Sequence, residues 1–113
     1  MFTSHRLFAA ALLVAALSCG GGAVPRPTDA HVARARTRWP DTTRASLERG
    51  RELYVARCSG CHPLHPPSTQ APARWAALLD QMAPRARLTA SERDLVLRYL
   101  TVASETERGP APE

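Results

Sequence analysis

The sequence contains no lysine, and all fifteen of its basic residues are arginine. With ten acidic residues the formal net charge is +5, and the arginines are scattered along the chain without interleaved aromatic residues. Proteins that bind nucleic acid typically gather their positive charge on one face or in a recognisable motif, and neither pattern occurs here. We therefore expect no nucleic-acid binding, and interpret the charge as a solvated basic surface that can steer an acidic partner protein.

Aromatic residues are also scarce, at 5% of the 113 residues, and the chain shows neither internal repeats nor strand-like alternation. This length allows one domain at most. Without its first residues the chain has about 95 residues, which is small for a core built from side chains alone. The composition favours an all-α domain whose core a bound cofactor completes.

Cysteine is limited to three positions, Cys19, Cys58 and Cys61. Cys58-Ser59-Gly60-Cys61-His62 is a C-x-x-C-H run, the attachment signature of c-type haem. Each of the two thiols can add to one vinyl group of the same porphyrin, and the next residue can bring an imidazole nitrogen to the iron. The motif predicts one haem c, bound covalently by Cys58 and Cys61, with His62 as the proximal axial ligand.

The C-x-x-C pair has other interpretations. A zinc site would need two further ligands, and a thioredoxin-like redox pair belongs in a βαβ pattern that the sequence lacks. A disulfide between Cys58 and Cys61 in a haem-free exported protein stays open as an alternative.

Residues 1–18 have the pattern of an export signal: a basic start, then an apolar run over residues 7–17 that is too short to span a membrane. Ala16-Leu17-Ser18-Cys19 resembles the lipobox of bacterial lipoproteins. The resemblance implies cleavage before Cys19, a lipid on this cysteine, and anchoring on the periplasmic side of the envelope. Gly20, in place of Asp, implies the outer membrane. An ordinary signal peptide without lipid is the alternative.

The remaining chain divides into a tether with a short helix (19–45), a helical domain (46–104) and a flexible tail (105–113). We expect helices over residues 29–38, 46–57, 73–83 and 90 to about 103. Asp29 would cap the first helix, Pro84 would end the third, and Thr89 with Glu92 forms a capping box for the last. Residues 63–72 hold four prolines and form a loop.

Gly50 and Tyr54 before Cys58, together with Tyr99-Leu100 near the chain end, resemble the first and last helices of class I cytochromes c. The resemblance covers about half of the chain and implies a small helical domain wrapped around one haem. It implies that Gly50, which lacks a Cβ, lets the two helices cross closely.

The resemblance also bears on the axial ligands. A carbonyl from the proline-rich loop, of Pro66 or Pro67, would accept the hydrogen bond of the His62 imidazole. Met82, the only methionine after the signal, precedes the last helix, as the ligand methionine of this family does. The sequence departs from the family in having Ala83 rather than proline after it, and Met82 is close to His62 in sequence.

The residues alone do not decide which side chain is the sixth ligand of the iron. Met82 shares an apolar helical stripe with Trp75, Leu78 and Leu79, so a core role competes with iron ligation. His65 is three residues from His62, a reach of ~10 Å that does not lead around the haem edge. His31 has enough chain to reach the iron but belongs to the segment near the tether.

The expected function is electron transfer between redox partner proteins, without catalysis. A haem enzyme or gas sensor with an open distal site, a haem-free lipoprotein module, and a subunit of a larger oxidoreductase are the alternatives. Trp39 is expected to pack its indole on the domain or on the haem edge. The alternative is that it is a simple surface anchor.

Overall fold

The structure, a computed structural model, describes residues 24–60 and 62–108. The predicted signal peptide, the lipidation residue Cys19, the second haem cysteine Cys61 and the last five residues lie outside the described residues. Within the described part the chain forms four α-helices and one short 3₁₀ helix with no strand, which confirms the all-α class. No helix in residues 24–60 or 62–108 has the length and apolar character needed to cross a membrane.

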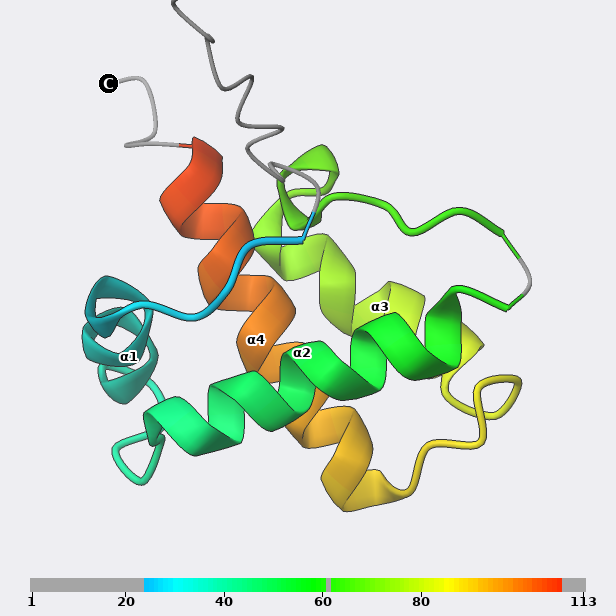
Figure 1. The fold of residues 1–113 in the computed structure, drawn as a ribbon, viewed down its shortest axis with the longest axis horizontal. Coiled ribbons are helices and arrows are strands. Elements are labelled where there is room, and N and C mark those ends of the chain that lie inside the picture. The colour runs from blue at the N-terminus through cyan, green and yellow to red at the C-terminus, as the bar shows by residue number, and fades with distance from the viewer. Residues whose placement is uncertain (1–23, 61, 109–113) are drawn as a thin grey trace, which may run out of the picture.

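The elements follow in the order α1 (Asp29–Arg36), α2 (Arg44–Cys58), η1 (Pro67–Thr69), α3 (Pro72–Met82) and α4 (Ala90–Arg108). Helices α2 and α4 cross at the centre of the molecule, and α4 also packs against α1, η1 and α3 (Figure 1). The loop after α2 leaves the domain and returns to it through η1 (Figure 1). Helix α4 is therefore the element on which all the others assemble.

The α2–α4 crossing depends on Gly50, which is buried in the middle of α2. A Cβ at this position would lie 2.2 Å from the carbonyl oxygen of Leu95 and 3.0 Å from the Cβ of Tyr99. Only glycine allows this close approach of two backbones. The crossing role predicted for Gly50 is confirmed.

The first two helices begin with threonine caps that the sequence analysis missed. Thr28, rather than Asp29, caps α1: its Oγ1 accepts the backbone N–H of His31, and its own N–H donates to Nδ1 of His31 at 2.9 Å. Thr43 and Ser46 form the same reciprocal pair at the start of α2, with both bonds at 3.0 Å. A capping side chain must stand before the first helical residue, so α2 begins two residues earlier than predicted.

Helix α3 ends at Met82, and the chain continues through Pro84 in a hydrogen-bonded turn over residues 83–87. The N–H of Leu88 donates to the carbonyl of Ala83 at 3.0 Å, and the N–H of Arg87 donates to that of Pro84 at 3.3 Å. Arg87 has φ 54°, in the left-handed region. These features define a Schellman motif, which usually has glycine at the left-handed position.

Helix α4 continues to Arg108, so residues 105–108 are helical although the sequence analysis placed them in the tail. Glu105 forms two ion pairs, one with Arg34 of α1 at 3.2 Å and one with Arg38, which follows α1. These pairs, with the packing of α1 on α4, explain why the helix persists past the predicted end.

Residues 24–45, assigned from the sequence to the tether, pack on the same core as the domain. The hydroxyl of Tyr99 donates to the carbonyl of Pro25 at 2.6 Å, and Arg51 Nε donates to the carbonyl of Val24 at 3.1 Å. Val32 and Ala35 of α1 are buried in the core. Trp39 is half-buried against this core with the guanidinium of Arg98 5.5 Å from its ring centre.

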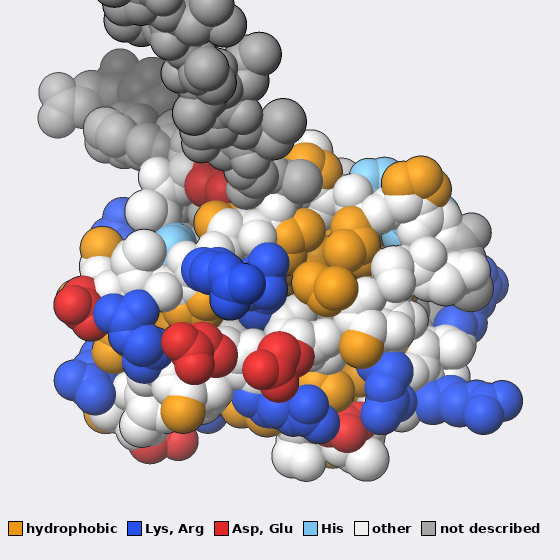
Figure 2. All heavy atoms as spheres, in the orientation of Figure 1, with side chains coloured by type: hydrophobic (Ala, Val, Ile, Leu, Met, Phe, Trp, Pro, Cys, Tyr) orange, Lys and Arg blue, Asp and Glu red, His pale blue; other side chains and the backbone are white. Residues whose placement is uncertain are grey.

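Charged side chains of both signs are interspersed across the face formed by α1 and α2 (Figure 2). On this face hydrophobic side chains gather toward the loop that follows α2 (Figure 2). The interspersed charges form no single-sign field here, in keeping with the scattered arginines of the sequence.

Substitution of Gly50 by alanine tests the helix crossing. At an open helix position this change would stabilise the protein by about 1 kcal/mol. Here we expect it to lower the free energy of unfolding by about 2–3 kcal/mol, because the new methyl group overlaps the backbone of α4. Gly60→Ala is the control, since a Cβ there meets no atom within 4 Å. Urea denaturation of both variants measures the difference, and a stabilised Gly50→Ala would refute the close crossing.

His31 makes the stability of α1 depend on pH. Its side chain is 4% exposed, and burial, helped by Arg44, lowers the pKa of His31 below its ordinary value of 6.5 against an opposing effect of Glu107. The neutral ring also accepts the N–H of Thr28, which a protonated ring cannot do. The stabilising contribution of neutral His31 is therefore complete above pH 6.5 and is lost as the pH falls through the lowered pKa.

His31→Gln keeps a capping side chain at this position but removes the titration. Between about pH 8 and about pH 5, we expect the wild type to lose more unfolding free energy than His31→Gln. Urea denaturation at several pH values gives the comparison. Parallel pH profiles would contradict the role given to His31.

Candidate haem site

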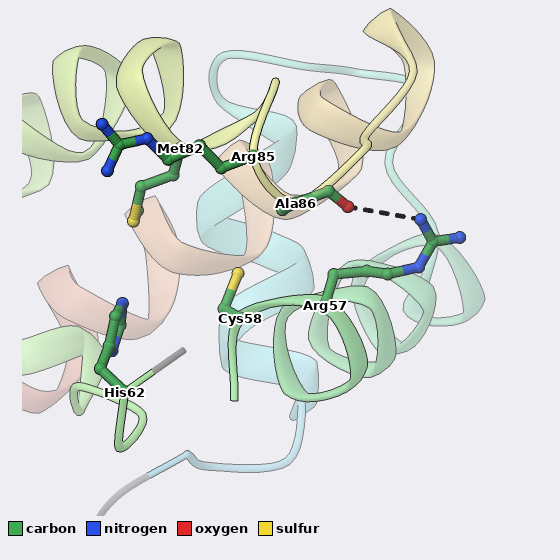
Figure 3. A pocket seen from close by; sticks show the side chains of 6 residues that line it. All are labelled: Arg57, Cys58, His62, Met82, Arg85 and Ala86. Atoms are coloured by element: carbon green, nitrogen blue, oxygen red, sulfur yellow. Dashed lines mark hydrogen bonds between the residues drawn. The ribbon is translucent and has the colours of Figure 1, made fainter. Parts of the chain in front are cut away.

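A hollow of about 140 Å³ lies between the carboxyl end of α2 and the turn that follows α3 (Figure 3). Its lining residues are Arg57, Cys58, His62, Met82, Arg85 and Ala86. Three of the four residues predicted to hold haem thus line one cavity, and the fourth, Cys61, lies outside the described residues.

Cys58 is the last residue of α2 and is 7% exposed. Its position is fixed because α2 is anchored one turn earlier by the buried side chains of Leu53 and Tyr54. Figure 3 shows its sulfur directed into the hollow from α2, while the sulfur of Met82 enters from the opposite wall. Two sulfur atoms from distant parts of the chain therefore face one space.

His62 is exposed, and its ring lies along the lower wall of the hollow (Figure 3). Its Nδ1 is 2.8 Å from the carbonyl oxygen of Pro63. A carbonyl only accepts, so this contact requires a proton on Nδ1 and leaves the lone pair of Nε2 for a metal. The tautomer suits an axial ligand.

The predicted acceptor, Pro66 or Pro67, is wrong. The Pro66 carbonyl accepts the backbone N–H of Thr69 at 3.0 Å, and the Pro67 carbonyl accepts Nε1 of Trp75 at 3.0 Å. Both carbonyls are used to form η1 and to hold it against α3, which leaves the nearer Pro63 for His62.

Buried aromatic side chains hold the loop behind the cavity. The hydroxyl of Tyr54 donates to the carbonyl of His65 at 2.5 Å, and the Tyr54 and Trp75 rings meet edge to face with centroids 6.1 Å apart. Burial raises the pKa of Tyr54 to about 12, so the phenol remains a donor at neutral pH. These anchors were not predicted from the sequence, although a buried tyrosine or tryptophan predicts a partner for its polar atom.

Met82 is only partly buried, whereas Trp75 and Leu79 of the same stripe are 1% and 0% exposed. It packs against the core and also lines the cavity, so its side chain lies at the edge of the core. The ring of His65 is 5.1 Å from that of His62 but does not line the cavity. His31 is buried on α1 with its Nδ1 at Thr28.

Two arginines that the sequence analysis did not single out line the cavity. Arg57 and Arg85 bring positive charge to it, and no Asp or Glu is among its lining residues. Guanidinium groups bind carboxylates well, often through two parallel hydrogen bonds. The cavity thus combines a thiol, an imidazole and a thioether with a basic border, a set that fits an iron porphyrin carrying carboxylate side chains.

Residues 24–60 and 62–108 contain no group of three or more His, Cys, Asp or Glu side chains that could hold a metal ion. The metal ligands that the cavity does offer are an imidazole and a thioether, together with the thiol of Cys58.

No family model, no curated protein and no solved structure matches the chain. The interpretation of the site therefore depends on its own residues.

Tyr54→Phe tests the support of the loop. Loss of the hydroxyl leaves the His65 carbonyl without its donor, and we expect the unfolding free energy to fall by about 1 kcal/mol. Limited proteolysis should cut faster within residues 62–66. Tyr99→Phe is the matched control, because the same chemical change there releases Pro25 instead. Equal cleavage of the loop in both variants would contradict the role of Tyr54.

Proposed function

We propose that the protein is a monohaem c-type cytochrome that carries single electrons between redox partner proteins in the bacterial cell envelope. The observation that supports this most strongly is the convergence of Cys58, His62 and Met82 on one cavity beside the C-x-x-C-H motif. In this proposal Cys58 and Cys61 hold one haem c covalently, while His62 and Met82 are the axial ligands. The bound iron would supply one-electron transfer by alternating between two oxidation states.

The chain's own residues each have a defined task. The Pro63 carbonyl orients the His62 ring and keeps its Nε2 available. The buried side chains behind Met82 limit the access of water from the side of α3. Arg85 offsets the negative charge of carboxylates on the cofactor.

Electron transfer is favoured over catalysis by the groups around the cavity. A thioether ligand stabilises reduced iron and fills the position that a substrate would need. The lining residues include no carboxylate to serve as a general acid or base. The protein is therefore a carrier, and its partners present a redox centre and an acidic surface that its positive net charge attracts; this charge is +5 for the full sequence and +4 once the signal with Arg6 is removed.

The N-terminal pattern completes the proposal. Cys19 carries a lipid that anchors the protein on the periplasmic side of the envelope, at the outer membrane. Both thioether formation and lipidation belong to exported proteins, so the two patterns agree.

Expression in a cell able to attach haem c tests the function. We expect the intact mass to exceed that of the polypeptide and its lipid by one haem, and the visible spectrum to be that of low-spin iron. Met82→Ala should convert the iron to a high-spin form that binds carbon monoxide readily. Leu78→Ala is the control, since Leu78 lies on the same helix and packs on the core but does not line the cavity.

The outcomes separate the alternatives. A mass without haem and a Cys58–Cys61 disulfide would refute the cytochrome and favour a haem-free lipoprotein. A haem protein that is already high-spin before substitution would favour the enzyme or gas sensor. A low-spin spectrum that Met82→Ala leaves unchanged would exclude Met82 as ligand.

A further inference from the structure

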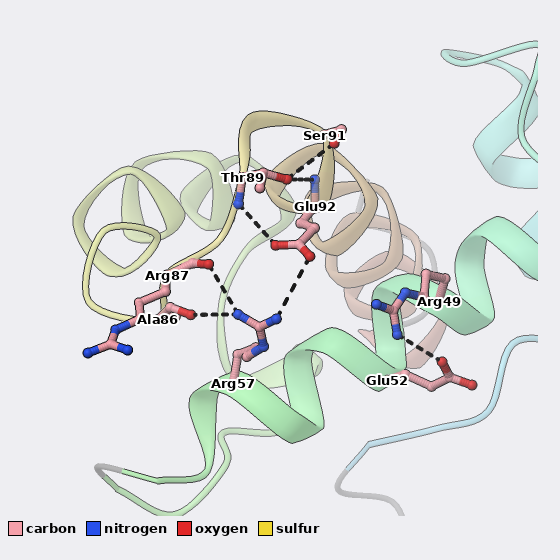
Figure 4. A network of polar contacts seen from close by, with 8 residues as sticks. All are labelled: Arg49, Glu52, Arg57, Ala86, Arg87, Thr89, Ser91 and Glu92. Carbon is pink, nitrogen blue, oxygen red and sulfur yellow. Dashed lines mark hydrogen bonds and ion pairs between the residues drawn. The ribbon is translucent and has the colours of Figure 1, made fainter.

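Arg57 connects two elements that border the cavity, the end of α2 and the turn after α3, to the start of α4. It precedes Cys58 in α2, and its Nη1 lies 3.1 Å from the carbonyl oxygen of Arg87 and 3.4 Å from that of Ala86 (Figure 4). Its Nη2 lies 3.8 Å from Oε1 of Glu92 in α4. One guanidinium therefore joins the end of α2, the turn after α3 and the start of α4.

The turn that Arg57 contacts has an unfavourable residue at its bend. The backbone of Arg87 has a left-handed conformation. Residues other than glycine adopt this conformation at a cost in free energy and keep it only where their surroundings impose it. The carbonyls at this bend lie beyond the helix end, where backbone acceptors lack helical partners. The guanidinium supplies donors to two of them.

Glu92 ties the same guanidinium to the start of α4. Its Oε2 accepts the N–H of Thr89 at 3.0 Å, which completes the predicted capping box, while Oε1 faces Arg57. A charge on Glu92 thus both caps α4 and attracts Arg57. The turn after α3 is held between these two helices.

Met82 lies at the other end of this turn. The N–H of Ala86 donates to the carbonyl of Met82 at 2.9 Å, so a shift of the bend is transmitted to the residue that enters the cavity. We propose that Arg57 is a positioning residue: by binding the carbonyls of Ala86 and Arg87, it keeps the Met82 thioether in the cavity and the sixth coordination position closed. This inference rests on the proposed function, and it adds a residue that controls whether the iron is open to an external ligand.

The test compares Arg57→Ala with Arg49→Ala in the haem-loaded full chain. Arg49 lies on the same helix, is exposed, and within residues 24–60 and 62–108 pairs only with Glu52 at 3.4 Å, so its removal changes charge and helix propensity in the same way (Figure 4). The measurements are the absorption band of methionine-ligated ferric haem and the fraction of ferrous protein that binds carbon monoxide rapidly. We expect Arg57→Ala to raise that fraction roughly tenfold and Arg49→Ala to leave it unchanged.

Arg57→Lys gives a second variant that retains the charge. A lysine ammonium lacks the planar fork that reaches two carbonyls and a carboxylate together, so we expect an intermediate fraction. If Arg57→Ala does not fold, the comparison of Arg57→Lys with Arg49→Lys decides. Equal carbon monoxide binding in the Arg57 and Arg49 variants would overturn the inference.

Hydrogen exchange on the full chain before haem attachment provides a readout that needs no cofactor. The amides of Ala86 and Leu88 should exchange roughly tenfold faster in Arg57→Ala than in Arg49→Ala, because the turn loses its partner. Unchanged exchange would overturn the inference while leaving the cytochrome proposal intact. If the wild type gains no haem, the proposed function is refuted, and the inference that Arg57 controls the binding of Met82 to the iron is refuted as well.

Discussion

The contact between the backbones of α2 and α4 at Gly50 sets the geometry of the whole site. Because no Cβ intervenes, the carbonyl of Leu95 lies where a side chain would otherwise be. The close crossing fixes the direction in which α2 ends, and α2 ends in Cys58. It also fixes the start of α4, from which Glu92 faces Arg57. One glycine, about two turns before Cys58, therefore places the wall of the cavity that α2 forms and the helix start that holds Arg57.

The cavity lies at the edge of the hydrophobic core, where side-chain packing is incomplete. Trp75 and Leu79 complete the packing of α3, but Met82 on the same stripe is only partly buried and borders open space. In a chain with 5% aromatic residues, a flat apolar cofactor would add the contact area that the side chains do not provide. Folding and cofactor binding would then be coupled, because the bound group stabilises only the folded chain.

Local patterns in the sequence were sufficient for the presence of the four helices and for the capping box at Thr89, because each follows from residues near one another in sequence. The close approach at Gly50 was expected from the resemblance, and it agrees with the lack of a side chain at that position. The convergence of Cys58, His62 and Met82 on one cavity was expected from the resemblance, and the packing of α3 on α4 explains it. The acceptor of the His62 hydrogen bond was predicted wrongly, because Trp75 and Thr69 compete for the same carbonyls and the sequence does not rank competing donors. Arg57 was missed because its acceptors are backbone atoms, which every residue possesses.

The docking of Val24 on α2 has a consequence for how far the domain can travel. Arg51 binds the Val24 carbonyl, and Tyr99 binds that of Pro25, so the folded unit begins only five residues after Cys19. If that cysteine is held at a lipid surface, even a fully extended connection of this length spans only ~18 Å. A domain on so short a connection cannot shuttle across the periplasm. Electron exchange would then take place within about one domain diameter of the bilayer, and its partners would have to come to that surface or be anchored there themselves.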